Sequence, residues 1–392
     1  MSEINFDPVN LTQSLVKCAS VTPKDEGALT VVENHLSAIG CDCHPLIFSG
    51  NNSYEVKNLF ATIGNEGKHF AYAGHTDVVP VGNESSWKYP PFSAKIDEGK
   101  LYGRGSEDMK SSVACFISAA KRFVDTYKNL PGKISFIITG DEERDSVNGT
   151  PRILEWASKQ NYKFDHCLVG EPTSKNEVGD KVKIGRRGSV SFFFQVKGIQ
   201  GHTANSHLAE NSSHHLVSLL NSILEEPLDE GNENFLPTSV QIATIDIGNP
   251  VQNVIPELAK ATVNIRFNDM HSSDSLIKWI DNKIEKIFSK LENASCTYTY
   301  DATAESFLNK AGDLYNIISK SISDVTGKNS PPEQATDGGT SDARYIKNYC
   351  EVVELGLRNQ TLHKVDEFVF VEDIIKLENI YFRILENYFD VN

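Results

Sequence analysis

Metal-binding and acid–base side chains gather at a few points of this sequence, most of them where a short apolar run ends. The residues concerned are His75, Asp77, Asp108, Glu142, Glu143, Glu171 and His363. Imidazole and carboxylate together form a ligand set that suits zinc, with cobalt or manganese as substitutes. Two His, one Asp and two of the Glu would give five protein ligands. This number exceeds what one tetrahedral zinc ion with an open position can use. The set therefore favours two metal ions that share one bridging carboxylate.

A site with two metals is typical of hydrolases, because the ions acidify a water molecule that can then attack a carbonyl carbon. A carboxylate that binds no metal can take the proton from that water. The spacing His75-x-Asp77 fits an imidazole that a nearby carboxylate orients. Taken singly, His75 could be structural, Asp77 could cap a helix, and Glu142 and Glu143 could form a solvated turn. Their placement at successive strand ends favours a metal site.

The elements that must position these residues alternate between strand and helix in the two outer parts of the chain. Apolar runs typical of buried strands are 58–63, 69–73, 133–139, 165–169 and 351–355, and helical patterns cover 29–39, 109–127, 314–325 and 371–388. Ligands in open α/β sheets bind beyond the carboxyl ends of the strands. We therefore expect an α/β catalytic domain over 1–185 and 301–392, with a mainly parallel sheet flanked by helices.

The middle of the chain has a different order of elements. Between residues 189 and 300 the patterns read strand, helix, strand, strand, helix and strand. This is the β-α-β-β-α-β order of the ferredoxin-like fold. It predicts an inserted α+β domain over residues 186–300, and a length of 392 residues suits two domains.

The composition restricts the partners of the protein. Lys and Arg number 38 against 53 Asp and Glu, so the formal net charge is −15, and such a surface disfavours nucleic acid. No apolar run approaches the length that crosses a bilayer, and the N-terminal residues lack the pattern of a secretion signal. Seven scattered cysteines without a CxxC pair predict reduced thiols. We expect a cytoplasmic protein that binds neither nucleic acid nor membrane.

Five motifs resemble, in the same order, the metal-binding motifs of the M20 metallopeptidase family. They are 75–80 (HTDVVP), 103–110 (GRGSEDMK), 140–143 (GDEE), 170–172 (GEP) and 362–367 (LHKVDE). The resemblance implies two zinc ions per chain, for which cobalt can substitute. It implies that Asp108 bridges the ions, that His75 and Glu171 complete one of them, and that Glu143 and His363 complete the other.

The same resemblance implies roles outside the ligand set. Glu142 is the expected general base, Asp77 is expected to orient His75, and the peptide bond after Asp108 is expected to be cis. The inserted domain resembles the dimerisation or lid domain of the family. It therefore implies a homodimer in which His202 of one subunit reaches the reacting carbonyl in the other.

Finer motifs are similar to a branch of the family that hydrolyses N-succinyl-LL-2,6-diaminopimelate to succinate and LL-2,6-diaminopimelate, a step towards lysine and the cell wall. They imply that the substrate's carboxylates are held by Arg186, Asn253, Arg266, Gly339, Thr340, Ser341 and Asn359. A substrate with several carboxylates needs arginine forks and hydroxyl or backbone donors. Taken alone, Arg266 could form an ordinary salt bridge and His202 could cap a loop.

Three residues depart from the usual family pattern, and two other functions stay open. Glu107 occupies a position where a small residue is common, Ser111 replaces a common Gly, and Asn205 replaces a common Tyr. One alternative is another M20 amidohydrolase, such as an acetylornithine deacetylase or an aminoacylase, and a substrate panel separates these. The other is a catalytically silent binding protein, which would contain zinc but turn over no N-acyl amino acid.

Overall fold

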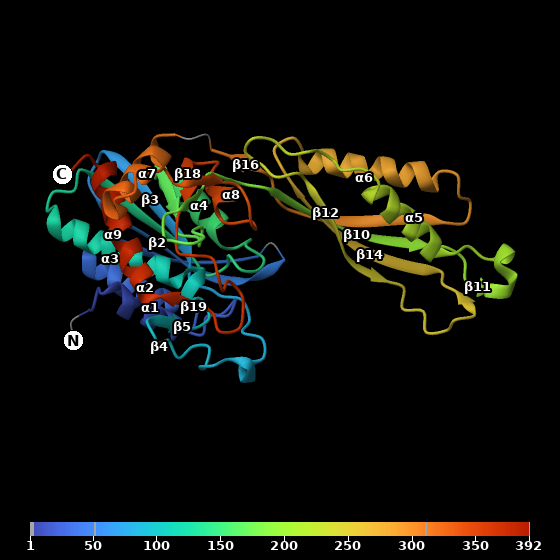
Figure 1. The fold of residues 1–392 in the computed structure, drawn as a ribbon, viewed down its shortest axis with the longest axis horizontal. Helices are drawn as coiled ribbons and strands as arrows, with labels where there is room; N and C mark the ends of the chain where they lie inside the picture. The colour runs from blue at the N-terminus through green and yellow to red at the C-terminus, as the bar shows by residue number, and fades with distance from the viewer. Residues whose placement is uncertain (1–3, 51, 310–311, 392) are drawn as a thin grey trace. The chain divides into compact units, whose positions relative to one another are not determined.

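The computed structural model describes residues 4–50, 52–309 and 312–391, which fold into two compact units (Figure 1). Unit 1 comprises Met1–Ile184, Asn309–Ala335 and Ser341–Asn392, and unit 2 comprises Gly185–Leu308 with Thr336–Thr340. Unit 2 is thus an insertion that also includes a short segment from the C-terminal part of the chain. Among the described residues, no helix combines the length and apolar character that a membrane span requires.

The centre of unit 1 is an eight-stranded mixed sheet in the order β1-β2-β6-β3-β7-β18-β8-β17. Its strands are β1 Asp42–Gly50, β2 Ser53–Gly64, β3 Lys68–His75, β6 Gly132–Thr139, β7 His166–Val169, β8 Lys181–Lys183, β17 Glu333–Ala335 and β18 Glu351–Glu354. The four central strands, β6, β3, β7 and β18, run parallel to one another. Antiparallel pairing occurs between β1 and β2, β2 and β6, and β18 and β8. The mainly parallel sheet predicted from the sequence is therefore a mixed sheet with a parallel centre.

Helices cover both faces of this sheet. They are α1 Pro8–Val16, α2 Ala28–Ile39, α3 Ser111–Thr126, α4 Thr150–Lys159, α7 Asp313–Thr326, α8 Ala343–Ile346 and α9 Val371–Tyr388. On one face Phe70 and Tyr72 stack on Phe116 of α3, and α3 lies beside α9 (Figure 1). Elsewhere in the sheet, Phe60 of β2 contacts Trp156 of α4. Cover on both faces explains why the central strands are continuous apolar runs.

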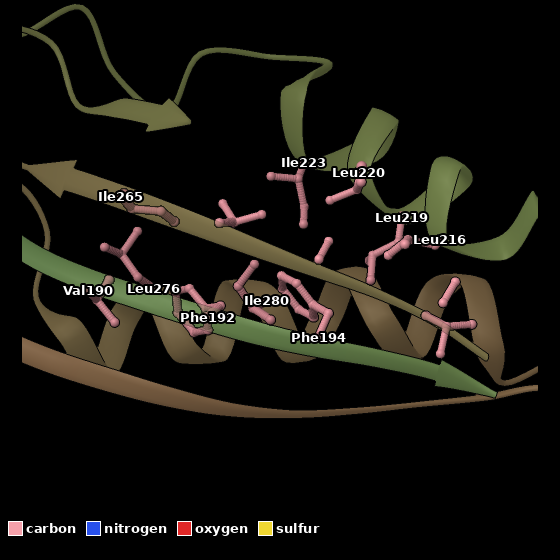
Figure 2. Packing of buried hydrophobic residues seen from close by; sticks show 14 of the residues in the cluster. Val190, Phe192, Phe194, Leu216, Leu219, Leu220, Ile223, Ile265, Leu276 and Ile280 are labelled. Carbon is pink, nitrogen blue, oxygen red and sulfur yellow. The ribbon is translucent and has the colours of Figure 1, made fainter. Parts of the chain in front are cut away.

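Unit 2 contains a four-stranded antiparallel sheet and two helices. Its main elements are β10 Gly188–Lys197, α5 Ser212–Leu224, β12 Ser239–Asp246, β14 Leu258–Phe267, α6 Ser273–Phe288 and β15 Ser295–Ala304, and the sheet order is β12-β14-β10-β15. Val190, Phe192 and Phe194 alternate along β10 and point into the core, where they meet side chains such as Leu219 of α5 and Ile280 of α6 (Figure 2). The β-α-β-β-α-β order predicted from the sequence is confirmed.

Short elements complete both units. In unit 1 they are β4 Lys95–Asp97, β5 Lys100–Tyr102, β19 Phe368–Phe370, η1 Glu84–Ser86 and η2 Ser106–Lys110. In unit 2 they are β9 Gly185–Arg186, β16 Phe307–Leu308, β11 Gly201–His202, β13 Val254–Ile255 and η3 Thr203–Leu208. Strand β9 pairs with β16, and β11 pairs with β13.

Candidate metal centre

The residues that the sequence marks as metal-binding or acid–base groups all belong to unit 1. Most follow the carboxyl ends of the parallel strands β3, β6, β7 and β18, and Asp108 lies in η2 before α3. The carboxyl ends of neighbouring parallel strands meet at one edge of a sheet. The topology therefore brings residues from five separate segments of the chain to one place.

Asp108 lies at the middle of this cluster, with one imidazole at each carboxylate oxygen. His75 Nε2 is 3.2 Å from Oδ1, and His363 Nε2 is 3.2 Å from Oδ2. Beyond them, Glu171 Oε1 lies 3.9 Å from His75 Nε2, and Glu143 Oε1 lies 3.1 Å from His363 Nε2. The peptide bond from Asp108 to the next residue is cis, as the family resemblance implied.

These donor atoms fit two metal ions that share Asp108. Zinc bonds of about 2.0–2.1 Å at tetrahedral angles separate neighbouring ligand atoms by roughly 3.3 Å. The two separations of 3.2 Å between histidine nitrogen and Asp108 oxygen match this spacing. Two groups of possible ligands have their atoms within 4.8 Å of one another: His75, Asp108 and Glu143, and His75, Glu142 and Glu171. The geometry thus allows Glu142 to act as a ligand or as a base.

The acidic groups of the cluster influence one another strongly. Burial, with the added charge of Glu171, raises the pKa of Glu142 well above its ordinary value. Burial and the charge of Asp108 raise the pKa of Glu143 to about 7. For Asp108 itself, burial opposes ionisation, but hydrogen bonds from the two imidazoles outweigh burial and hold the pKa below its usual range. A divalent cation would relieve the repulsion among these buried carboxylates.

His75 is oriented through its second ring nitrogen. Nδ1 donates to the backbone carbonyl of Asp77 at 2.9 Å, which leaves Nε2 facing Asp108 as the candidate ligand nitrogen. The sequence predicted that the Asp77 carboxylate would make this contact, but its Oδ1 is 3.6 Å from Nδ1. The carboxylate accepts the backbone N–H groups of Glu142 and Glu143 at 3.1 Å each and the Thr22 hydroxyl at 2.7 Å. Asp77 therefore positions the two glutamates as well as the imidazole.

Two further buried carboxylates hold the loop between β6 and α4, which carries the paired glutamates. Asp141 accepts the backbone N–H groups of residues 147–148 at 3.1 and 3.2 Å. Asp342 accepts the hydroxyls of Ser146 at 3.2 Å and Thr150 at 2.6 Å. Sequence reasoning assigned neither carboxylate a role. The only available signal was the position of each within a motif, because their partners lie elsewhere in the chain.

The predicted carboxylate-binding residues are divided between the units. Arg186, Asn253, Arg266, Gly339 and Thr340 belong to unit 2, and Ser341 and Asn359 belong to unit 1. The buried Arg186 donates from Nη1 to the carbonyl of Gly339 at 2.9 Å, so two predicted residues lie together. Arg266 donates from Nε to the Asn264 side-chain oxygen at 3.2 Å.

Three further predicted residues, Asn253, Ser341 and Asn359, take part in hydrogen bonds. The Asn253 carbonyl accepts the backbone N–H of Thr203 at 3.0 Å. The Ser341 hydroxyl donates to the buried carboxylate of Glu354 at 2.7 Å. Asn359 donates to the carbonyl of Pro172 at 3.4 Å, which places it next to the segment that carries the candidate ligand Glu171.

His202 belongs to unit 2 and is exposed. Its Nδ1 accepts the backbone N–H of Ala204 at 3.0 Å, so the side chain caps η3. The capping contact that the sequence also allowed for His202 is therefore present in the structure. Because Nδ1 accepts, the neutral ring carries its proton on Nε2, and Nε2–H is a donor.

Comparison with known proteins relates the whole chain to a metallohydrolase family. The profile described as peptidase family M20/M25/M40 matches residues 71–387. The succinyl-diaminopimelate desuccinylase of Parvibaculum lavamentivorans is 44% identical over 384 residues, which cover 98% of this chain and 96% of the relative. That of Ehrlichia canis is 44% identical over 388 residues, covering 99% and 100%. Among solved structures, the Bacillus subtilis YXEP protein, described as a dinuclear metal-binding peptidase from the M20 family, matches with a TM-score of 0.68 at 14% identity over 97% of each chain.

Proposed function

This chain belongs to peptidase family M20/M25/M40, and from this premise we propose that it hydrolyses N-succinyl-LL-2,6-diaminopimelate to succinate and LL-2,6-diaminopimelate. Relatives at 44% identity over nearly the full chain bear the name of the enzyme for this reaction. The observation that carries the chemistry is Asp108 with one imidazole at each of its oxygens. The direct test is turnover of N-succinyl-diaminopimelate beside N-acetylornithine.

The proposed cofactors are two zinc ions per chain, with cobalt as a possible substitute. Asp108 would be shared by the two ions, His75 and Glu171 would hold one of them, and Glu143 and His363 would hold the other. When bound, such ions polarise the amide carbonyl and lower the pKa of a water molecule at the site.

The residues of the chain then move the proton and orient the reacting groups. Glu142 takes a proton as the water oxygen bonds to the succinyl carbonyl carbon, and it delivers that proton to the amide nitrogen as the carbon–nitrogen bond breaks. The Asp77 carboxylate accepts the backbone N–H of Glu142 at 3.1 Å, and this contact supports a fixed position of Glu142 as the base. The products are succinate and the free amine.

The substrate carries three carboxylates into a protein with net charge −15, so local donors must offset the repulsion. The proposed donors are Arg186, Asn253, Arg266, Gly339, Thr340, Ser341 and Asn359. Arginine presents several N–H groups in a planar fork that matches a carboxylate. The contact between Arg186 and the Gly339 carbonyl supports the proposal, because it orders two of these donor segments together.

We expect N-succinyl-diaminopimelate to be hydrolysed at least about tenfold better, in kcat/KM, than its N-acetyl counterpart. The acetyl group lacks the terminal carboxylate, and donors left unpaired typically cost about 1–3 kcal/mol. Steady-state kinetics on the two substrates measure this ratio. If N-acetylornithine is turned over as well as or better than N-succinyl-diaminopimelate, the chain is a deacetylase. The proposed two-metal mechanism would not be affected by that result.

Arg266 provides the matching variant test of the same selectivity. Arg266→Ala should raise KM or reduce the preference for the succinyl substrate while zinc content stays unchanged. The control is Lys260→Ala, because Lys260 is an exposed cation on the same strand, β14. If both variants behave alike, the effect reflects overall charge and not a carboxylate contact at Arg266.

We further propose a homodimer that forms through unit 2. Strand β12 is an edge of the unit 2 sheet, and its Ile245 side chain is 53% exposed. Edge strands pair readily across a two-fold axis, and on helix α5 of the same unit Val217 is 59% exposed. Light scattering after size exclusion should give twice the chain mass of 43.5 kDa.

The dimer prediction has a paired variant test. Ile245→Lys should shift the protein to monomer, whereas Ile47→Lys on the edge strand β1 of unit 1, where the side chain is 60% exposed, should leave the dimer intact. A stable, fully active monomer of the natural sequence would contradict the proposed dimer and the role of His202 across subunits.

The expected location is the cytoplasm. All seven cysteines are free, in keeping with the reduced thiols expected from the sequence. A biosynthetic hydrolase of a small, charged substrate needs neither nucleic acid nor a membrane as a partner.

A further inference from the structure

Glu107, one of the three departures from the family pattern, holds the loop that carries His363. Its side chain is 1% exposed. Oε1 accepts the backbone N–H of Gln360 at 2.7 Å, and Oε2 accepts that of Thr361 at 2.7 Å. The Thr361 hydroxyl donates to the same carboxylate. The residue next to Asp108 therefore anchors the backbone just before His363.

Glu367 makes the reverse connection, from the His363 loop back to Asp108. Its Oε1 accepts the backbone N–H groups of Glu107 at 2.9 Å and Asp108 at 3.3 Å. Its Oε2 accepts a hydrogen bond from Arg104 Nη1 at 2.7 Å, and Arg104 also donates from Nη2 to the His363 carbonyl at 3.3 Å. Each carboxylate thus binds two amides of the other's segment.

We propose that Glu107 and Glu367 form a reciprocal clamp that positions His363 against Asp108 and so preforms the second metal position. This inference depends on the proposed function, because it assumes the proposed two-metal centre. A metal ligand must be held within about 0.5 Å of its productive position, and this depends on the residues around it. Glu107 is a positioning residue, because it contacts the loop and not the proposed ions.

His363 needs such support more than the other histidine does. Its side chain is 44% exposed against 1% for His75, and it lies in a loop, whereas His75 ends a central strand. Its backbone has φ of 59°, in the left-handed region that a non-glycine residue keeps only when its surroundings hold it there. Loss of the clamp should therefore weaken the metal position of His363 and spare that of His75.

The test is titration of the metal-free chain with Zn²⁺, followed by calorimetry, and with Co²⁺, followed by visible absorption. The natural chain should bind two ions. Glu107→Ala should bind the first ion as before and the second about 10–100-fold more weakly, the usual cost of losing a contact behind a metal ligand. Glu107→Gln keeps one acceptor oxygen and should fall between the two.

Glu378→Ala is the matched control. Glu378 is also a buried carboxylate, 8% exposed, but it lies on α9 and contacts Arg122. This variant should alter thermal stability without changing either metal affinity. If Glu107→Ala or Glu107→Gln loses stability yet binds both ions as tightly as the natural chain, the clamp has no role in metal binding and the inference is wrong. If the natural chain binds fewer than two ions, the proposed metal centre itself fails.

Discussion

Glu142→Gln is expected to lower kcat by about 10²–10⁴-fold while the protein keeps two metal ions, because the proposed base is removed and no proposed ligand is. Glutamine has nearly the shape of glutamate but cannot take up the proton of the attacking water. The Asp77 carboxylate binds the backbone N–H of residue 142, so the anchoring contact survives the substitution. Steady-state kinetics and metal analysis of the same preparation measure both effects.

The metal content decides between two roles that the geometry leaves open for Glu142. Its carboxylate lies with His75 and Glu171 in a group of atoms within 4.8 Å of one another, which could hold an ion. Loss of one ion in Glu142→Gln would make Glu142 a ligand. Near-normal turnover of Glu142→Gln would show that Glu142 is not the general base. His363→Ala is the comparison variant, since it should lose one ion along with activity.

His202→Ala is expected to lower kcat by about 10²–10³-fold without loss of metal, the usual effect of removing one donor to a developing oxyanion. The Nδ1 contact with Ala204 leaves Nε2–H as the free donor of the neutral ring. His207→Ala is the matched control, because His207 is an exposed histidine within η3, the helix that His202 caps, and its loss should leave kcat unchanged. Equal losses in the two variants would point to a general effect on this loop.

Mixed dimers test whether His202 acts across subunits. Equal amounts of inactive His202→Ala and Glu142→Gln chains, allowed to re-pair at random, should recover about a quarter of normal activity, because half the dimers then contain one intact site. If His202 acts within its own chain, every site stays defective. Co-purification of differently tagged chains establishes that exchange has occurred. No recovery after proven exchange would contradict the role across subunits.

The parts of the fold that the sequence predicted are those with strong, local patterns. Apolar runs such as 58–63 and 133–139 correspond to β2 and β6, and the helical pattern over 29–39 corresponds to α2. Strand β1 was not predicted, because it is an edge strand that contains Pro45 and carries mixed side chains. Helix α4 was also not predicted, although its buried residues Thr150, Ile153, Leu154 and Ala157 recur at helical spacing.

The start of α3 is a further difference with a local cause. The apolar pattern predicted a helix from residue 109, whereas α3 begins at Ser111. Asp108 and Met109 have non-helical backbone angles within η2. This backbone geometry turns Asp108 towards His75 and His363, which side-chain periodicity cannot reveal.

The sequence by itself determined the family, the types of the candidate ligand residues, their order at strand ends and the two kinds of domain architecture. These properties depend on side-chain identity and on periodicity, both of which are local along the chain. Only the tertiary structure decided which atoms make the supporting contacts. The backbone carbonyl of Asp77, rather than its carboxylate, orients His75. Glu107 binds amides 253 and 254 positions away, and such a partner is set by packing of distant segments that no local pattern encodes.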